Sequence, residues 1–313
     1  MEINEIYELA IDLGIESDLR GKEKVYKFLG KAKKKYELLN EKEKEFFDFE
    51  TLKNPYSDTR ILVDNNRKEI KKILTGIDID GSELLLAEKI GADLVIAHHP
   101  EGSALAGLHN VMGLQSEILA DYGIPINIAE ALMKPRMLEV ERNISPYNHN
   151  KIVDFAKILK IDFMCTHTIA DNLGAKFLYN IFENNKNIET LGDIVSELLK
   201  IDEFKIAKKQ GMGPIIFVGS EDNSCGKIAI TEFTGGTSGS KEIYEKMANS
   251  GIGTIIGMHI NEEYKKEAEK YHINVVIAGH IASDSLGMNL FLDQLEKKGI
   301  EIVPCSGLIR IKR

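Results

Sequence analysis

Residues 81–99 read GSELLLAEKIGADLVIAHH, and this stretch indicates the fold of the chain. Its first part, 81–92, has the apolar spacing of a short helix that ends near Gly91. Its second part, DLVIAHH at 93–99, is a β-branched apolar run typical of a buried strand. A helix that leads directly into a fully apolar strand is the repeating unit of a parallel sheet covered on both faces.

Other short apolar runs, bounded by Gly, Pro or polar residues, follow residue 54. They are IKKILTGIDI (70–79), IPINIAEA (124–131), DFMCTHT (162–168), PIIFVG (214–219), KIAITEF (227–233), GTIIGMH (253–259) and INVVIAGH (273–280). Helical patterns such as SKEIYEKMANSG (240–251) and SLGMNLFLDQLEKKG (285–299) separate several of them. The alternation predicts an α/β protein with largely parallel sheets flanked by helices.

Composition narrows the class of protein. The chain has 313 residues, of which 43% are hydrophobic and 28% charged, as in a folded globular protein. A net charge of -9 argues against nucleic acid or a membrane surface as the partner. The three cysteines form no CxxC pair, and no apolar run reaches membrane-spanning length, so we expect a cytoplasmic protein.

The first 54 residues have a different texture. They mix both signs of charge and carry apolar residues at helical spacing, and NPYSDT at 54–59 is turn-like. We expect an N-terminal helical extension over 1–54 that acts as a solvated cap or an interaction arm rather than as a nucleic-acid-binding segment.

Five of the eight histidines come at or just after the end of an expected strand: His98, His99, His167, His259 and His280. Ligands of open α/β sheets bind at the carboxyl ends of the strands. Any single histidine there is readily explained as a loop residue, but five together favour a metal or catalytic site.

Two carboxylates accompany these histidines. In GHIASDS, His280 and Asp284 are four residues apart at the start of an expected helix and share one helical face. In THTIADN, Asp171 follows His167 by four residues. Structural explanations remain open, because Asp284 suits a helix start electrostatically and Asp171 could cap a helix beginning near Leu173. His167 could also orient a ligand rather than bind metal itself.

The doublet His98–His99 suggests two ions. Adjacent strand side chains diverge, so each imidazole could serve its own divalent ion, of the Zn, Fe or Mn type. Asp284 could bridge the ions, and Asp171 and His280 could add ligands at the opposite ends of the metal pair. Such pairs of ions activate a shared water, which favours hydrolysis of a phosphoryl or amidine-type substrate.

A glycine-rich segment could add substrate contacts. TEFTGGTSGSKEIYEKM (231–247) links a strand to a helix, and its backbone amides could hold a phosphate, although a tight turn is the plainer explanation. His259 and Glu262, in GMHINEE, could act as a general base in the same cleft or merely cap a surface helix. The segments 99–110 and 134–150, with His109 and His149, look like loops.

The chain resembles the Nif-three-like dinuclear metal centre family. The similarity rests on IDIDGSELLLAEKIGADLVIAHHP (77–100), FTGGTSGSKEIYEKMANSGIGTIIGMHINEE (233–263) and INVVIAGHIASDSLGMNLFLDQLEKKGIEI (273–302), and it extends in order over about residues 55–313. The family's metal ligands fall on His98, His99, Asp171, His280 and Asp284. The family pattern implies His98 with His280 on one ion, His99 with Asp171 on the other, and Asp284 between them.

The resemblance has further implications. It implies a two-lobed fold, with a discontinuous metal-binding lobe at 55–178 and 264–313, a middle lobe inserted at 179–263, and often a homohexamer. Members are catalogued as homologues of a type-two GTP cyclohydrolase I. This chain departs from the family in having Asp284 where a glutamate is usual, in the segment after the doublet, and in its N-terminal extension.

Three functions follow as hypotheses. The first is a hydrolase of a small phosphorylated or nucleotide-like substrate, acting through a hydroxide that bridges two metal ions, with Asp284, His259 and Glu262 as catalytic residues. The second is a non-catalytic metal-binding regulatory or scaffold assembly. The third is a module that senses a nucleotide through the glycine-rich turn.

Overall fold

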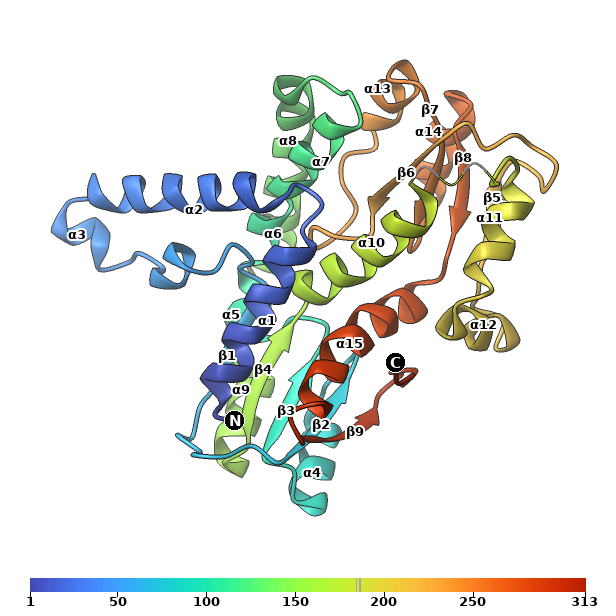
Figure 1. The fold of residues 1–313 in the computed structure, drawn as a ribbon. Coiled ribbons are helices and arrows are strands. Elements are labelled where there is room, and N and C mark those ends of the chain that lie inside the picture. Colours follow the sequence, from blue (N-terminus) through green and yellow to red (C-terminus); the bar gives the residue numbers. More distant parts are fainter. Residues whose placement is uncertain (184, 186) are drawn as a thin grey trace.

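Two β-sheets form the framework of the protein, seen in a computed structural model that describes residues 1–183, 185 and 187–313 (Figure 1). The five-stranded sheet has the order β1-β4-β3-β2-β9, and only β1 runs antiparallel to its neighbour. Its strands are β1 (Thr59–Val63), β2 (Lys72–Gly76), β3 (Leu94–Ala97), β4 (Asp162–Thr166) and β9 (Glu301–Cys305). The expected α/β class with mostly parallel sheets is confirmed.

The second sheet has four strands in the order β5-β8-β7-β6, with β5 antiparallel to β8. Its strands are β5 (Ile215–Val218), β6 (Lys227–Glu232), β7 (Ile252–Gly257) and β8 (Asn274–Ile277). The expected lobe boundary at residue 263 assigned β8 to the other lobe, whereas its hydrogen bonds place it in this sheet. The division into a discontinuous lobe and an inserted lobe stays a prediction.

Both faces of the five-stranded sheet are covered because its strands are apolar on both sides. Ile73, Leu94 and Ile96 belong to a core shared with helices on one face, while Leu74 and Val95 pack with helices on the other. The helices of the first face are α1 (Ile3–Ser17), α10 (Thr168–Phe182) and α15 (His280–Glu296). Those of the second face are α4 (Gly81–Ile90) and α9 (Lys151–Leu159). This two-sided burial explains the unbroken apolar run in β3.

The remaining helices are α5 (Gly102–Ala106), α6 (Leu108–Val111), α7 (Gly113–Asp121), α8 (Ile126–Ile144), α11 (Leu191–Leu198), α12 (Asp202–Lys209), α13 (Ile243–Asn249) and α14 (Glu262–Lys270). Of these, α5 contacts β1 of the five-stranded sheet, and the others lie toward the second sheet (Figure 1). None of the helices within the described residues combines the length and the apolarity needed to span a bilayer.

The N-terminal extension consists of two different parts. Helix α1 buries Ile6, Ala10 and Ile15 in the main core against α10. It is therefore an integral layer of the fold. By contrast, α2 (Lys22–Glu37), α3 (Glu41–Lys44) and the 3-10 turn η1 (Phe49–Leu52) form a hairpin that projects away from both sheets (Figure 1).

Several sequence expectations were wrong in this region of the fold. The run at 124–131 is not a strand, and 134–150 is not a loop, because both lie largely in α8. Pro125 occupies the N-cap of α8, and Ala129, Met133, Val140 and Ile144 recur at helical spacing on its buried side. His109 lies in the short helix α6, and α10 begins at Thr168 rather than near Leu173.

Candidate metal centre

The histidine doublet follows β3 and continues its pairing with β2. The backbone N–H groups of His98 and His99 donate to the carbonyls of Gly76 and Ile77, at 3.0 and 2.9 Å. His98 is fully buried, whereas the side chain of His99 is 29% exposed. The two rings therefore occupy one site at different depths, with centroids 5.3 Å apart.

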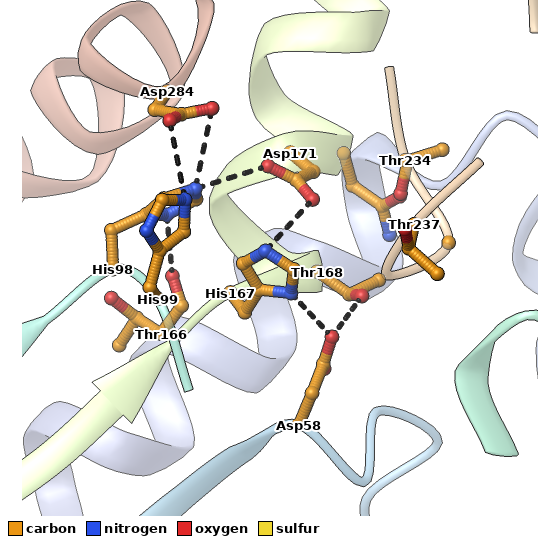
Figure 2. A network of polar contacts seen from close by, with 12 residues as sticks. Asp58, His98, His99, Thr166, His167, Thr168, Asp171, Thr234, Thr237 and Asp284 are labelled. Atoms are coloured by element: carbon orange, nitrogen blue, oxygen red, sulfur yellow. Dashed lines mark hydrogen bonds and ion pairs between the residues drawn. The ribbon is translucent and has the colours of Figure 1, made fainter. Parts of the chain in front are cut away.

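Asp284 connects the two rings. Its Oδ1 atom lies 3.5 Å from Nε2 of His98, and its Oδ2 atom lies 3.6 Å from Nε2 of His99 (Figure 2). The divergence expected of adjacent strand residues thus directs the imidazoles to opposite oxygens of one carboxylate.

One glycine lets the helices that carry the carboxylates cross closely, and a second lies at the start of one of these helices. A Cβ atom on Gly287 of α15 would lie 2.1 Å from the carbonyl oxygen of Ala170 in α10, so only glycine permits this close crossing. The crossing places Asp171, in the first turn of α10, beside Asp284 of α15. Gly279 has a φ of 114°, which lets the chain leave β8 and begin α15 at His280.

The converging atoms have no hydrogen-bond partners. Nε2 of His98, Oδ1 of Asp171 and both carboxylate oxygens of Asp284 are buried and unpaired. Leaving buried polar atoms unpaired is costly, and such groups require an explanation. A metal ion supplies one, because two ligand atoms about 2.1 Å from the same ion lie roughly 3.0–3.5 Å apart. The residues present therefore fit a metal site.

The donor atoms form three groups within the described residues. One contains only imidazoles, from His98, His99 and His167, and the other two share Asp284. The inner group is His98, Asp171 and Asp284, in which Nε2 of His98 lies 3.4 Å from Oδ1 of Asp171. The outer group is His99, His280 and Asp284, in which Nε2 of His280 lies 3.5 Å from Oδ2 of Asp284.

This grouping differs from the pairing that the family resemblance implied. His98 lies with Asp171 rather than with His280, and His99 lies with His280 rather than with Asp171. Depth provides the physical reason, because His98 and Asp171 are buried while His99 and His280 are partly open, with side chains 29% and 42% exposed.

Burial favours metal binding at His98 but opposes it at Asp171, whose carboxyl must lose its proton to bind a cation. Burial lowers the pKa of His98 to about 4, so its imidazole is neutral and its Nε2 lone pair is available at neutral pH. Burial raises the pKa of Asp171 to about 8, and the neighbouring Asp284 and Asp58 carboxylates add to that effect. Burial also opposes ionisation of Asp284, but His98, His99 and His280 outweigh it and hold its pKa well below the usual range.

Further acids orient the imidazoles. Asp58 Oδ2 accepts from Nδ1 of His167 at 2.8 Å and from the hydroxyl of Thr168 at 2.6 Å (Figure 2). The opposite ring nitrogen of His167 lies 3.9 Å from Asp171. Burial lowers the pKa of His167, but Asp171 and Asp58 outweigh it and raise the pKa to about 9. Fixing a ring by its second nitrogen is common around metal centres.

The Nδ1 atoms of His99 and His98 also have partners. Nδ1 of His99 lies 2.7 Å from Oδ1 of Asp78, and Nδ1 of His98 lies 3.3 Å from the carbonyl oxygen of Thr166. Sequence reasoning missed Asp58 and Asp78. Asp58 sits in the turn-like NPYSDT, and Asp78 follows a strand end in the motif IDID, where acids are common for purely local reasons.

Solved structures show the same architecture. A NIF3 superfamily protein from Sphaerobacter thermophilus is 28% identical, with a TM-score of 0.75 over 82% of this chain and 94% of that chain. The chain has a NIF3-superfamily fold. HcgD from Methanocaldococcus jannaschii, in its reduced form, is 19% identical with a TM-score of 0.51, over 84% of this chain and 94% of that chain, and shares the fold alone. No family model and no curated protein matches the sequence.

In this NIF3-superfamily fold, a cavity of about 40 Å³ opens onto the centre. One wall consists of the centre itself, with His167, Asp171, His280 and Asp284. The glycine-rich segment after β6 forms the opposite wall, through Thr234, Gly236, Thr237 and Ser238. The expected cleft therefore exists, and its volume accommodates water or a small reacting group.

His259 reaches this cavity, while Glu262 does not. The ring of His259 lies 5.1 Å from that of His280, and burial together with His280 lowers the pKa of His259. Glu262 lies at the exposed start of α14, where it pairs with Lys266 at 3.6 Å, and it is not among the residues that line the cavity. The polar face of α14 turns Glu262 to solvent.

Glu232 is a cavity residue that sequence reasoning missed. It ends β6, and burial raises the pKa of its carboxyl to about 7 although Ser238 and Arg136 act in the opposite direction. The signal in the sequence was an acid at a strand end, in ITEF, next to the glycines. Without knowledge of the opposite wall, that acid could not be distinguished from a solvent-facing residue.

Proposed function

We propose that this NIF3-superfamily protein is a metal-dependent hydrolase that binds two divalent ions and acts on a small phosphorylated or nucleotide-like substrate. The observation that carries the proposal is the set of unpaired buried donor atoms beside an open cavity. Hydrolysis of GTP, as in a type-two GTP cyclohydrolase I, is the narrowest form of the proposal.

The donor set indicates the kind of ion. Imidazole nitrogens and carboxylate oxygens, with no thiolate among the converging atoms, suit Zn, Fe or Mn. When bound, such ions polarise a substrate oxygen and lower the pKa of a coordinated water. His98, Asp171 and Asp284 would hold the inner ion, and His99, His280 and Asp284 the outer one.

Access to the centre supports catalysis over a purely structural use of the metal. Structural metal sites are closed by protein ligands, whereas catalytic sites keep an open position. Asp171, His280 and Asp284 all line the cavity, and the side chain of His280 is 42% exposed. A reacting group of the substrate that enters the cavity would meet donors of both groups.

Residues on the other walls suit proton transfer and substrate binding. The lowered pKa of His259 keeps its imidazole neutral, as a base requires. Glu232 holds a proton up to about pH 7, so it can donate one to a leaving group or to a phosphoryl oxygen. The hydroxyls of Thr237 and Ser238 face the same cavity and suit a phosphoryl group.

The glycine-rich wall is held rigidly from behind. Nε2 of Gln115 donates to the carbonyls of Gly235 and Thr237 at 3.0 and 2.7 Å, and Nε of Arg136 donates to the carbonyl of Ser238 at 3.2 Å. These bonds fix the position of the segment before substrate arrives. Preorganised groups of this kind lose little freedom on binding.

Hydrolysis of a substrate panel tests the proposal. The protein would be reconstituted with Zn, Fe(II) or Mn and assayed on GTP, other nucleotides, simple phosphoesters and amidines. We expect turnover that disappears with chelator and falls about 10²–10⁴-fold in His259→Gln. Glu262→Gln is the matched control and should retain wild-type rates. Full metal loading without turnover on any member of the panel would contradict the hydrolase and support the scaffold alternative.

The homohexameric state and the cytoplasmic location remain predictions from the resemblance and the composition.

A further inference from the structure

Helix α1 presents an acidic face to solvent. Glu5, Glu8, Asp12 and Glu16 are exposed and lie on the side opposite the buried Ile3, Ile6 and Ala10. Within residues 1–21 there are six acidic side chains against a single arginine. The apolar face anchors α1 in the core, so the position of this acidic face is fixed relative to the body of the protein.

Helix α2 presents a basic face. Residues 22–37 contain seven lysines against two glutamates, and Lys27, Lys31 and Lys34 are exposed on the side opposite the buried Val25 and Leu29. The helix projects away from both sheets (Figure 1). In the described part of the chain, these three lysines form no ion pair within 4 Å, and neither do Glu5, Glu8 and Asp12.

The two faces match in spacing when the helices run antiparallel. The acids lie at intervals of three and four residues, as Glu5, Glu8 and Asp12, and the lysines have the same intervals in reverse, as Lys34, Lys31 and Lys27. With a rise of about 1.5 Å per residue, one antiparallel register sets Glu5 against Lys34, Glu8 against Lys31 and Asp12 against Lys27. The match is therefore one of pattern as well as of net charge.

The faces cannot satisfy each other within one chain, because α2 leads away from α1 at their junction. There, Lys22 and Glu16 form an ion pair at 3.0 Å, and the rest of the two helices diverges (Figure 1). We propose that α1 and the projecting α2 form an interface between two copies of this chain, with each α2 lying antiparallel on the α1 of the other copy. Each copy gives and receives one helix, so the contact is isologous and joins the copies in pairs.

An apolar residue extends the basic face. Leu38 follows α2 one turn after Lys34 on the same side, and it is 86% exposed. In the antiparallel register it would pass beyond Glu5 and cover the apolar side chain of Met1 in the other copy, which is only partly buried in the single chain. Contact between exposed apolar side chains adds a salt-independent part to an interface that is otherwise screened by salt.

Charge reversal tests the proposal without reference to catalysis. The arm variant carries Lys27→Glu and Lys31→Glu, and the body variant carries Glu8→Lys and Asp12→Lys. Glu5 stays unchanged because its side chain caps the N-terminus of α1. Sedimentation velocity at low ionic strength should give each variant half the wild-type mass, since like charges then face each other.

An equimolar mixture of the two variants should regain the wild-type mass, because the acidic α2 of one then meets the basic α1 of the other. Recovery on mixing also shows that both variants are folded. The control, Lys33→Glu with Lys35→Glu, changes the same number of charges on α2 outside the matched face and should keep the wild-type mass. A monomeric wild type, unchanged mass in both variants, or a mixture that stays at the lower mass would overturn the proposal.

Discussion

Nε2 of His98 lies 3.5 Å from Oδ1 of Asp284, and neither atom has a hydrogen-bond partner although both are buried. Core stability alone does not explain a neutral imidazole and a carboxylate unpaired at this distance, because burying polar groups without hydrogen bonds is costly. The geometry fits two ligands of a common ion.

The two groups of donors should lose metal separately. His280→Ala removes a partly exposed member of the outer group, so we expect the bound metal to fall from two ions per chain to one. Asp171→Asn should instead empty the inner group. Elemental analysis with anomalous diffraction at the metal edge would locate the ion that remains. The grouping would be wrong if both variants retained metal at the same position.

Asp58 should act on the centre through His167. Asp58→Asn keeps the shape of the side chain but removes the charge that holds Nδ1 of His167 at 2.8 Å. We expect metal affinity or turnover to fall about 10–100-fold. Chelator competition would measure the affinity, and thermal melting of the metal-free protein would separate this effect from unfolding. Unchanged affinity in a folded variant would show that Asp58 does not act on the metal centre through His167.

Glu232 should shape the pH dependence of turnover. With a pKa of about 7, its carboxyl is protonated at low pH and loses its proton as the pH rises. If Glu232 donates a proton, kcat should therefore fall as the pH increases through about 7. Glu232→Gln should lower kcat about 10²–10⁴-fold and abolish that fall. The pH profile distinguishes proton donation from a structural role, which would leave the fall in place.

Helix α1 should contribute to the stability of the whole protein. Ile6 is fully buried against the core, so Ile6→Ala should lower the free energy of unfolding by about 2–5 kcal/mol. Asn4→Ala, at an exposed position of the same helix outside the matched acidic face, should change it by less than about 0.5 kcal/mol. Urea unfolding of both variants would check this. Equal effects would mean that α1 is a detachable arm.

The sequence predicted most of the framework because the central strands are apolar on both sides. Strands such as β3 and β8 and helices such as α4 follow directly from their patterns. The edge strands β1 and β9 were not predicted, because edge strands carry polar residues that interrupt the apolar pattern. In addition, β9 includes Pro304, which a central strand would exclude. The start of α8 was mistaken for a strand because its first turn is rich in isoleucine.

The five expected ligands converge in space, since each follows a strand or begins a helix at the same edge of the fold. The sequence could not reveal which of them lie together, because depth in the fold decides that. It also could not reveal Asp58, whose contact with His167 spans 109 residues of chain. Only the tertiary structure distinguishes that acid from a turn residue.

Asp284 belongs to two groups of donors and would contribute a ligand to each of two ions, so the number of bound ions shows whether it does. Elemental analysis of the protein, purified under metal-replete conditions, should find two divalent ions per chain. Asp284→Asn removes the charge but keeps the size of the side chain, and it should bind less than one ion per chain, while Glu262→Gln keeps both. Fewer than one ion per chain in the wild type, or full loading of Asp284→Asn, would contradict the account.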